Sequence, residues 1–230
     1  MPDKICMIAH RGYSGKYLQN TALAFEKAAE HLSGGAETDI RSTSDGVLVC
    51  SHDADAVFED GTRLAVSDST FAELTAKPLR NNLTEDKVYL CTFRRYLEIM
   101  RENDMICFIE LKGSFNDEKE KQVYDTIKEV YDISKCILQS FDFDNLIRMH
   151  ASFPDLPLMF TYGTCEDRWE RCFDYGISID ADRVVITEEI ISAFHEHGLE
   201  VGVWTVNDTS ELERISAMNV DYIESDVFGG

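Results

Sequence analysis

Three acidic residues interrupt short apolar runs, where an unpaired charge is costly to bury. Glu37 and Asp39 lie in one run and Glu110 lies in another. Positions i and i+2 of a β-strand face the same way, so Glu37 and Asp39 share a face if their run is a strand. Like charges that close require a cation or a shared proton. Three carboxylates with water suit a hard cation, Mg²⁺ or Ca²⁺, rather than zinc; the alternatives are a solvated strand end or an ion pair with Arg41.

Two histidines and two cationic residues accompany these acids. His10 and Arg11 end the first apolar run, His52 follows a short run further along, and Lys112 comes two positions after Glu110. Imidazoles can exchange protons near neutral pH, although either histidine alone is more often structural. Arginine and lysine are natural anion-binding groups in a chain this acidic. A metal, two imidazoles and two cations together describe a site for phosphoryl transfer or phosphodiester cleavage.

The elements that must position these residues alternate between short apolar runs and helical patterns. Parallel strands joined by helices through right-handed crossovers predict an α/β fold, a (β/α)8 TIM barrel, which suits 230 residues. Its active site would lie at the carboxyl ends of the strands, where the residues above fall. The expected strands are Ile5–Ala9, Ala36–Ile40, Met105–Leu111, Cys136–Gln139, Leu158–Thr161, Gly176–Ile179, Glu200–Thr205 and Asp221–Ile223. The expected helices outside the second crossover are Thr21–His31, Asn116–Tyr131, Phe143–Phe153, Glu166–Tyr175, Glu188–His197 and Ser210–Met218.

The segment between the second and third expected strands, residues 42–104, is too long for one βα loop. Its pattern predicts a short strand at Val47–Cys50 and helices near Thr70–Ala76 and Phe93–Glu102, the last serving as the barrel helix. We expect residues 53–92 to form a small insertion after the second strand, on the barrel rim. The whole chain is then one domain.

Composition narrows the class of protein. The chain has 22 basic and 43 acidic residues, a formal net charge of −21, so its surface repels polyanions and anionic bilayers. We therefore expect no nucleic-acid partner and no stable membrane insertion. The hydrophobic content of 44% supports a packed core, and no apolar run is long enough for a membrane span or a secretory signal. The expected location is cytoplasmic.

Several motifs, taken in order, resemble the glycerophosphodiester phosphodiesterase family. They extend over nearly the whole chain, which makes the resemblance specific. The amino-terminal motifs are Ala9-His10-Arg11-Gly12, Gln19-Asn20-Thr21-Ala22-Leu23-Ala24-Phe25, Glu37-Thr38-Asp39-Ile40, Asp45-Gly46-Val47-Leu48-Val49 and Ser51-His52-Asp53. The later ones are Ile109-Glu110-Leu111-Lys112, Gln139-Ser140-Phe141, Val203-Trp204-Thr205-Val206-Asn207 and Asp221-Tyr222-Ile223-Glu224-Ser225-Asp226.

The resemblance implies a TIM barrel that hydrolyses a small-molecule glycerophosphodiester to sn-glycerol 3-phosphate and an alcohol, with a divalent cation as cofactor. It also implies a role for each matching residue. His10 and His52 would be the acid/base pair. Glu37, Asp39 and Glu110 would bind the metal, Arg11 and Lys112 would hold the phosphate, and Trp204 would pack against the substrate, although Trp204 could also be a core residue.

One position departs from the family pattern. The family usually has Pro-Glu-Asn-Thr where this chain has Leu18-Gln19-Asn20-Thr21. Gln19 keeps the reach of glutamate without its charge, which weakens the local field on Arg11. Two alternatives follow: a catalytically silent phosphodiester-binding barrel, for which Gln19 is the argument, and a phospholipase D-like hydrolase of lysophospholipids. The latter would need an apolar surface, for which the insertion offers Val57, Phe58, Leu64 and Phe71.

Overall fold

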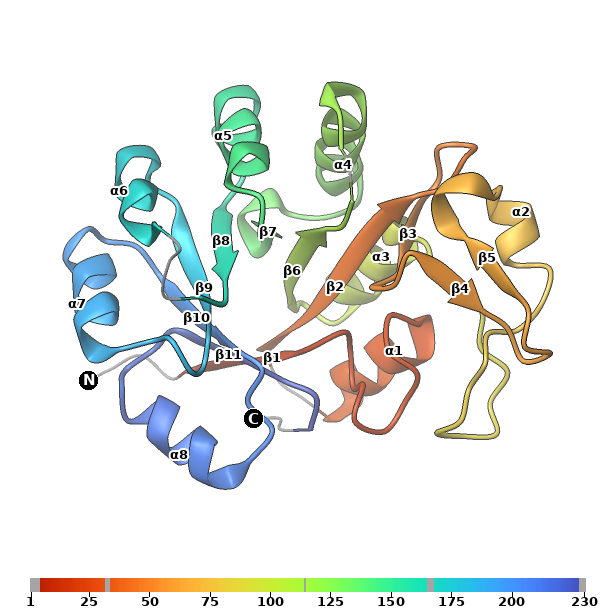
Figure 1. Ribbon diagram of the computed structural model, residues 1–230, viewed down its shortest axis with the longest axis horizontal. Coiled ribbons are helices and arrows are strands. Elements are labelled where there is room, and N and C mark those ends of the chain that lie inside the picture. Colours follow the sequence, from red (N-terminus) through yellow and green to blue (C-terminus); the bar gives the residue numbers. More distant parts are fainter. Residues whose placement is uncertain (1–4, 32–33, 114, 165–167, 228–230) are drawn as a thin grey trace.

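The computed structural model describes residues 5–31, 34–113, 115–164 and 168–227. In this part of the chain, eight parallel strands form one sheet in the order β1-β11-β10-β9-β8-β7-β6-β2, and pairing of β1 with β2 closes it into a barrel (Figure 1). The predicted TIM barrel is confirmed. The barrel strands are β1 (Cys6–Ala9), β2 (Gly34–Ser42), β6 (Ile106–Leu111), β7 (Cys136–Ser140), β8 (Leu158–Tyr162), β9 (Ser178–Asp182), β10 (Val201–Trp204) and β11 (Tyr222–Ser225).

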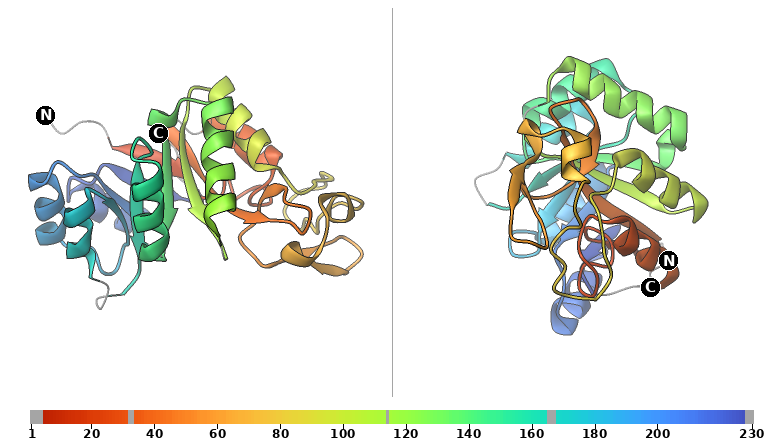
Figure 2. Two further views of the ribbon diagram at one scale, coloured as in Figure 1. Left: turned by 90° about the horizontal axis from the view of Figure 1, so that it is seen from above. Right: turned by 90° about the vertical axis from the view of Figure 1, so that its right-hand side faces the viewer.

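Helices surround the barrel and cover its outer face (Figures 1 and 2). Most begin at a side chain that accepts a hydrogen bond from the first turn, as Thr92 does from the amide of Arg95 and Asn116 from that of Lys119. The longer helices are α1 (Ala22–His31), α3 (Phe93–Glu102), α4 (Asp117–Val130), α5 (Phe143–Ser152), α7 (Glu188–Glu196) and α8 (Thr209–Ser216).

The helix expected at Glu166–Tyr175 is wrong in length. The chain forms a single 3-10 turn, η3 (Trp169–Arg171), followed by one α-helical turn, α6 (Cys172–Tyr175). No side chain in the described part of the chain caps η3, and Gly176 in the left-handed region at φ 63° ends α6. Residues 165–167 of the expected helix lie outside the described part of the chain.

The barrel interior has two layers, because alternate residues of each strand point inward. An apolar lower layer contains Ile8, Phe108, Ile137, Met159 and Tyr222, all buried. Two positions further along the same strands, the inward residue is polar in every case. These upper residues are His10, just past the end of β1, then Glu110, Gln139, Thr161 and Glu224. The apolar layer closes the barrel from below, so the polar layer becomes the floor of a cavity that opens at the carboxyl ends of the strands.

A small separate unit leaves the barrel after β2 and lies to one side of it in both Figure 1 and the left view of Figure 2. Its strand β3 pairs antiparallel with β2, while β4 and β5 form their own two-stranded sheet. Phe58, Val66 and Leu74 are buried in a core of its own, against Val49 and Leu90. Its elements are β3 (Leu48–Cys50), β4 (Asp55–Val57), β5 (Arg63–Ala65), η1 (Val66–Asp68) and α2 (Phe71–Leu74).

No helix among the described residues has the length and apolar character needed to cross a membrane.

Candidate active site

A cavity of about 260 Å³ lies at the carboxyl ends of the barrel strands. Seven of the eight residues selected from the sequence line it, although they come from five separate segments of the chain. The eighth, Asp39, is fully buried beside it. The lining contains His10, Arg11, Glu37, His52, Glu110, Lys112 and Trp204.

The turn after β1 brings Arg11 back over the acidic residues of β2. Arg11 itself has a left-handed backbone at φ 58°, and its amide donates to Glu37 Oε2 at 2.9 Å. Gly12 follows at φ 76°, and a Cβ there would lie 2.8 Å from the backbone carbon of Ala24, so this turn requires glycine. The local fold thereby fixes the Glu37 carboxylate with a backbone donor.

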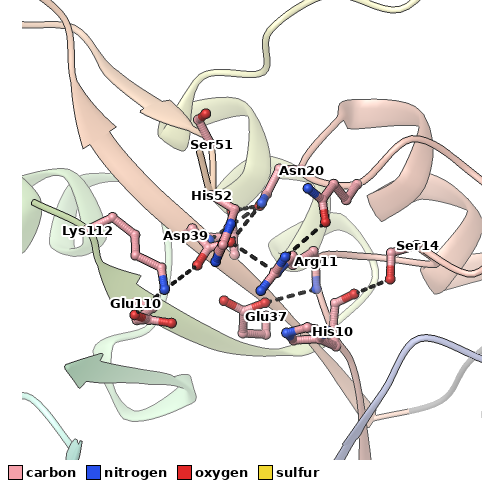
Figure 3. A network of polar contacts seen from close by, with 12 residues as sticks. His10, Arg11, Ser14, Asn20, Glu37, Asp39, Ser51, His52, Glu110 and Lys112 are labelled. Carbon is pink, nitrogen blue, oxygen red and sulfur yellow. Dashed lines mark hydrogen bonds and ion pairs between the residues drawn. The ribbon is translucent and has the colours of Figure 1, made fainter. Parts of the chain in front are cut away.

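Glu37, Asp39 and Glu110 form the predicted acidic cluster, with one carboxylate oxygen of each within 4.8 Å of the others. Figure 3 shows these side chains directed toward one another from the neighbouring strands β2 and β6. Lys112 Nζ lies 2.6 Å from Glu110 Oε1 and 3.3 Å from Asp39 Oδ1, and Arg11 Nε lies 3.3 Å from Asp39 Oδ2. The two predicted anion-binding residues therefore balance part of the acidic charge.

Asn20 holds Asp39 in place, a role that the sequence did not indicate. Its Nδ2 donates to Asp39 Oδ2 at 2.8 Å, and its Oδ1 accepts from the Thr38 hydroxyl at 2.8 Å. Asp39 Oδ1 has no hydrogen bond among the described residues although it is buried. A buried carboxylate oxygen beside two others fits a hard cation such as Mg²⁺ or Ca²⁺.

Burial makes the charged form of these acids unfavourable. It raises the pKa of Glu37 well above its ordinary value, and the Asp39 carboxylate raises it further. Burial, and then Asp39, also raise the pKa of Glu110 to about 7, against the opposing effect of Lys112. The Lys112 pKa is raised, because Glu110 and Asp39 outweigh the opposing and larger single effect of burial. The cluster thus has a high affinity for protons or for another cation.

His10 is oriented by an aspartate that the sequence analysis had given no role. Its Nδ1 lies 2.7 Å from Asp226 Oδ1, although the two residues are 216 positions apart. Burial acts to raise the pKa of Asp226, but hydrogen bonds from His10, Ser14 and Asn207 bring it to about 2. An ionised carboxylate can only accept, so Nδ1 is the donor and Nε2 is the ring nitrogen available to the cavity.

His52 has the same arrangement in a more exposed setting. Its Nδ1 lies 2.9 Å from Asp53 Oδ1, and its backbone carbonyl accepts two hydrogen bonds from the Arg41 guanidinium, at 2.7 and 3.2 Å. Arg41 therefore fixes the His52 loop, and the alternative in which it pairs with an acid of the cluster is not what the structure shows. Both histidines line one cavity from opposite sides of Arg11.

Trp204 ends β10 at the cavity mouth and is half-buried. Its indole nitrogen donates to the Asp180 carbonyl at 3.2 Å, and its ring meets that of Phe141 edge-on with centroids 5.5 Å apart. Phe141 is 47% exposed, and the Lys112 ammonium lies 5.4 Å from its ring centroid. Trp204 thus both packs against the barrel and lines the cavity, and Phe141 is a further aromatic residue at its edge.

The far side of the cavity carries four polar residues that the sequence analysis gave no part in the site: Gln139, Thr161, Asp180 and Glu224. Gln139 Nε2 donates to Glu224 Oε1 at 3.1 Å. Two of the four were missed because the expected strands ended too early, at Ile179 and Ile223. The inward-facing alternation, continued for one more residue on each strand, would have included Asp180 and Glu224.

Gln19 lies where its position in the motif suggested, next to Arg11. Its Oε1 accepts a hydrogen bond of 3.0 Å from Arg11 Nη1. The neutral amide therefore still orients the guanidinium, and only the negative charge of a glutamate is missing.

Known proteins resemble this chain over nearly its whole length. The family model described as "Glycerophosphoryl diester phosphodiesterase family" matches residues 10–229. A glycerophosphodiester phosphodiesterase of Bacillus altitudinis is 26% identical, over 96% of this chain and 94% of its own. Another, from Caldanaerobacter subterraneus subsp. tengcongensis, is 27% identical over 97% of this chain and 94% of its own.

Solved structures have the same fold. A phosphodiesterase of Oleispira antarctica, solved in complex with the product sn-glycerol-3-phosphate, superposes with a TM-score of 0.85 at 20% identity, over 96% of this chain and 92% of its own. A glycerophosphodiester phosphodiesterase of Thermotoga maritima gives a TM-score of 0.78 at 27% identity, over 97% of this chain and 95% of its own. With the match of the family model over nearly its whole length, the chain belongs to the glycerophosphoryl diester phosphodiesterase family and to that family's class of phosphoric diester hydrolases.

Proposed function

We propose that the protein hydrolyses glycerophosphodiesters to sn-glycerol 3-phosphate and an alcohol, with a divalent cation in the acidic cluster. The main support is one arrangement: two histidines, each with Nδ1 on a carboxylate, line the cavity that also contains the acidic cluster and two cationic side chains. The Oleispira antarctica phosphodiesterase that shares the fold was solved with sn-glycerol-3-phosphate bound, which is consistent with a substrate of this size.

In this proposal His10 and His52 transfer protons through Nε2. One imidazole accepts the proton of the attacking oxygen as that oxygen forms its bond to phosphorus, and the other donates a proton to the departing alcohol as the ester P–O bond breaks. Asp226 keeps Nε2 of His10 free for this exchange and stabilises the imidazolium that forms. Arg11 and Lys112 hold the phosphate, where their charges oppose the repulsion between the substrate and the acids.

Glu37, Asp39 and Glu110 would hold the cation. Their donor set contains only carboxylate oxygens, which suits Mg²⁺ or Ca²⁺. When bound, such an ion stabilises the negative charge that develops on the phosphoryl oxygens.

We also propose that residues 1–230 act as a single catalytic domain, with residues 53–92 as an insertion on its rim. A second, smaller hollow supports this. It is lined by His52 and Gln19 on the barrel side and by Leu79 and Arg80 from the insertion. The insertion therefore borders the site beside one of the two histidines.

The lysophospholipid alternative has little support in the apolar residues of the insertion. Phe58 is 1% exposed and belongs to the core of the insertion, and Phe71 packs against the same core. Of the large apolar side chains considered for a lipid surface, Leu64 is the one that is exposed. A short polar diester is therefore the better match to this cavity.

The test is the release of glycerol 3-phosphate from glycerophosphocholine in the presence of Mg²⁺, Ca²⁺ or a chelator. We expect release that depends on the cation and falls by at least ~10²-fold in His10→Ala. His150→Ala, on the outer helix α5, is the matched control and should retain the wild-type rate.

Equal rates in wild type and His10→Ala would exclude His10 from the mechanism. Release of choline from lysophosphatidylcholine but no turnover of glycerophosphocholine would support the phospholipase D-like alternative. No turnover of either substrate would support the silent barrel.

A further inference from the structure

The β9–β11 side of the cavity contains two buried acids that have no cationic side chain beside them among the residues that the structure describes. Asp180 is 1% exposed and Glu224 is 2% exposed. The polar contact of the Glu224 carboxylate is the amide of Gln139, at 3.1 Å. No ion pair within the described ranges involves either acid, in contrast to Glu110 and Asp39 across the cavity.

Asp180 also leaves an oxygen unused. Its Oδ1 is buried and makes no hydrogen bond within the described part of the chain. This oxygen lies on the cavity side of β10, where a Cβ on Gly202 would stand 2.6 Å from it. Because β10 separates β9 from β11, the unused oxygen lies on the side of Asp180 that faces Glu224.

A second set of metal-ligating atoms lies in the same cavity, which Asp180 also lines. One atom each of His10, Glu37 and Glu224 lies within 4.8 Å of the other two. His10 Nδ1 is bonded to Asp226, so the atom available for a ligand is Nε2. Glu37 belongs to both this set and the acidic cluster, so two bound ions would share its carboxylate.

The charges on the two sides of the cavity are also balanced to different extents. With a phosphodiester monoanion and one divalent ion present, the three acids Glu37, Asp39 and Glu110 are balanced by the ion together with Arg11 and Lys112. When ionised, the two acids of the other side add two negative charges that these cations do not balance, and burial makes such charges costly. One further divalent ion, or protonation of the acids, would remove this cost.

We propose that His10, Glu37 and Glu224, with Asp180 beside them, form a second cation site that takes a divalent transition-metal ion such as Zn²⁺. An imidazole nitrogen with carboxylates favours such an ion, whereas the all-oxygen cluster favours Mg²⁺ or Ca²⁺. Occupancy of the second site engages His10 Nε2, the nitrogen that the proposed function uses for proton transfer. Zn²⁺ is therefore an inhibitor of the Mg²⁺-activated enzyme, and this inhibitory effect rests on the proposed function.

Binding is measured first, without turnover, by calorimetric titration of Zn²⁺ into protein kept saturated with Mg²⁺. The variant is Glu224→Gln, which removes one ligand charge but keeps an oxygen that can accept from Gln139. Glu213→Gln, an exposed residue of α8, is the matched control. We expect wild type and Glu213→Gln to bind one Zn²⁺ more than Glu224→Gln, or to bind it at least ~10-fold more tightly.

Inhibition is measured second, with each rate normalised to that of the same variant without Zn²⁺. Glu224→Gln should require at least ~10-fold more Zn²⁺ for half-inhibition than wild type. Asp180→Asn should shift the same value in the same direction.

Identical Zn²⁺ stoichiometry and affinity in wild type and Glu224→Gln would overturn the site, and the two acids would then carry protons instead. Zn²⁺ binding that depends on Glu224 but leaves the rate unchanged would overturn the inhibitory effect. If the protein proved to have no phosphodiesterase activity, the calorimetric comparison would still decide the site.

Discussion

The two sides of the cavity differ in how the negative charge of their buried carboxylates is balanced. On the β2–β6 side, the carboxylates of Asp39 and Glu110 have Arg11 and Lys112 within 2.6 to 3.3 Å. On the β9–β11 side, Asp180 and Glu224 have no cationic side chain among the described residues, and the contact of Glu224 is a neutral amide. The carboxylates of the β2–β6 side are balanced by the side chains of Arg11 and Lys112. Those of the β9–β11 side require protons or an added cation. The following four experiments test this difference, from the largest expected effect to the smallest.

Lys112→Met should remove the compensation on the β2–β6 side. Breaking a buried ion pair leaves uncompensated charge, and we expect the free energy of unfolding of the metal-free protein to fall by about 3 kcal/mol near pH 8. Urea denaturation measures this change. Lys87→Met, which changes an exposed lysine, should leave the stability nearly unaltered. Unchanged stability in Lys112→Met would mean that Lys112 does not balance the acids of this side.

The metal-free protein should lose stability as pH rises from about 4.5 to about 7. Burial and Asp39 raise the pKa of Glu110 from 4.5 to about 7, so the folded state binds this proton more tightly than the unfolded state. Its contribution is complete below pH 4.5 and is lost as pH rises through 7, in total about 3 kcal/mol. Burial raises the pKa of Asp180 and Glu224 with the same sign.

Thermal denaturation across this pH range measures whether the stability falls or rises with pH. Glu224→Gln should show a shallower decline than wild type, because a neutral amide replaces one of the acids. Mg²⁺ should reverse the decline, because the cation binds the deprotonated carboxylates. A stability that increases from pH 4.5 to 7 in the chelated protein would contradict the raised pKa values of the buried acids on both sides of the cavity.

Asp226→Asn should reduce kcat by about 10- to 100-fold, because the amide does not stabilise an imidazolium at His10. Asp53→Asn is the matched change at His52, where the carboxylate is 70% exposed, and should have the smaller effect.

The pKa of Asp226 is lowered from 3.8 to about 2, so Asp226 stabilises the fold above pH 3.8 and loses this effect as pH falls through 2. Asp226→Asn should therefore also show a flatter acid limb in denaturation. Equal losses of kcat in Asp226→Asn and Asp53→Asn would show that the lower exposure of Asp226 does not strengthen its effect on its histidine.

Gln19→Glu should have the smallest effect, because the amide already accepts the Arg11 hydrogen bond. The added negative charge competes with the substrate phosphate for Arg11. We expect KM for glycerophosphocholine to rise about two- to threefold with kcat unchanged, in line with the modest energy of a partly exposed ion pair. Gln122→Glu on α4 is the matched control. A large gain in kcat would instead indicate that Gln19 limits the enzyme.

Local pattern was sufficient to predict the barrel and the acidic cluster. The cluster could be predicted because Glu37 and Asp39 differ by two positions on one strand, and β6 is the neighbour of β2. The ends of β9 and β11 could not be predicted in this way, since an acidic residue after an apolar run is equally typical of the start of a loop. In the folded barrel, Asp180 and Glu224 belong to β9 and β11, and their side chains point inward above the apolar layer.

By itself the sequence determined which residues face inward, because side-chain alternation is a local property of a strand. It thereby determined the apolar layer and, except at the ends of β9 and β11, the polar layer above it. The tertiary structure decided which polar groups pair. His10 meets Asp226 because β1 and β11 are adjacent in the closed barrel. Arg11 and Lys112 fall on one side of the cavity, and the described residues place no cationic side chain on the other. Barrel closure sets these distances, and spacing along the chain does not.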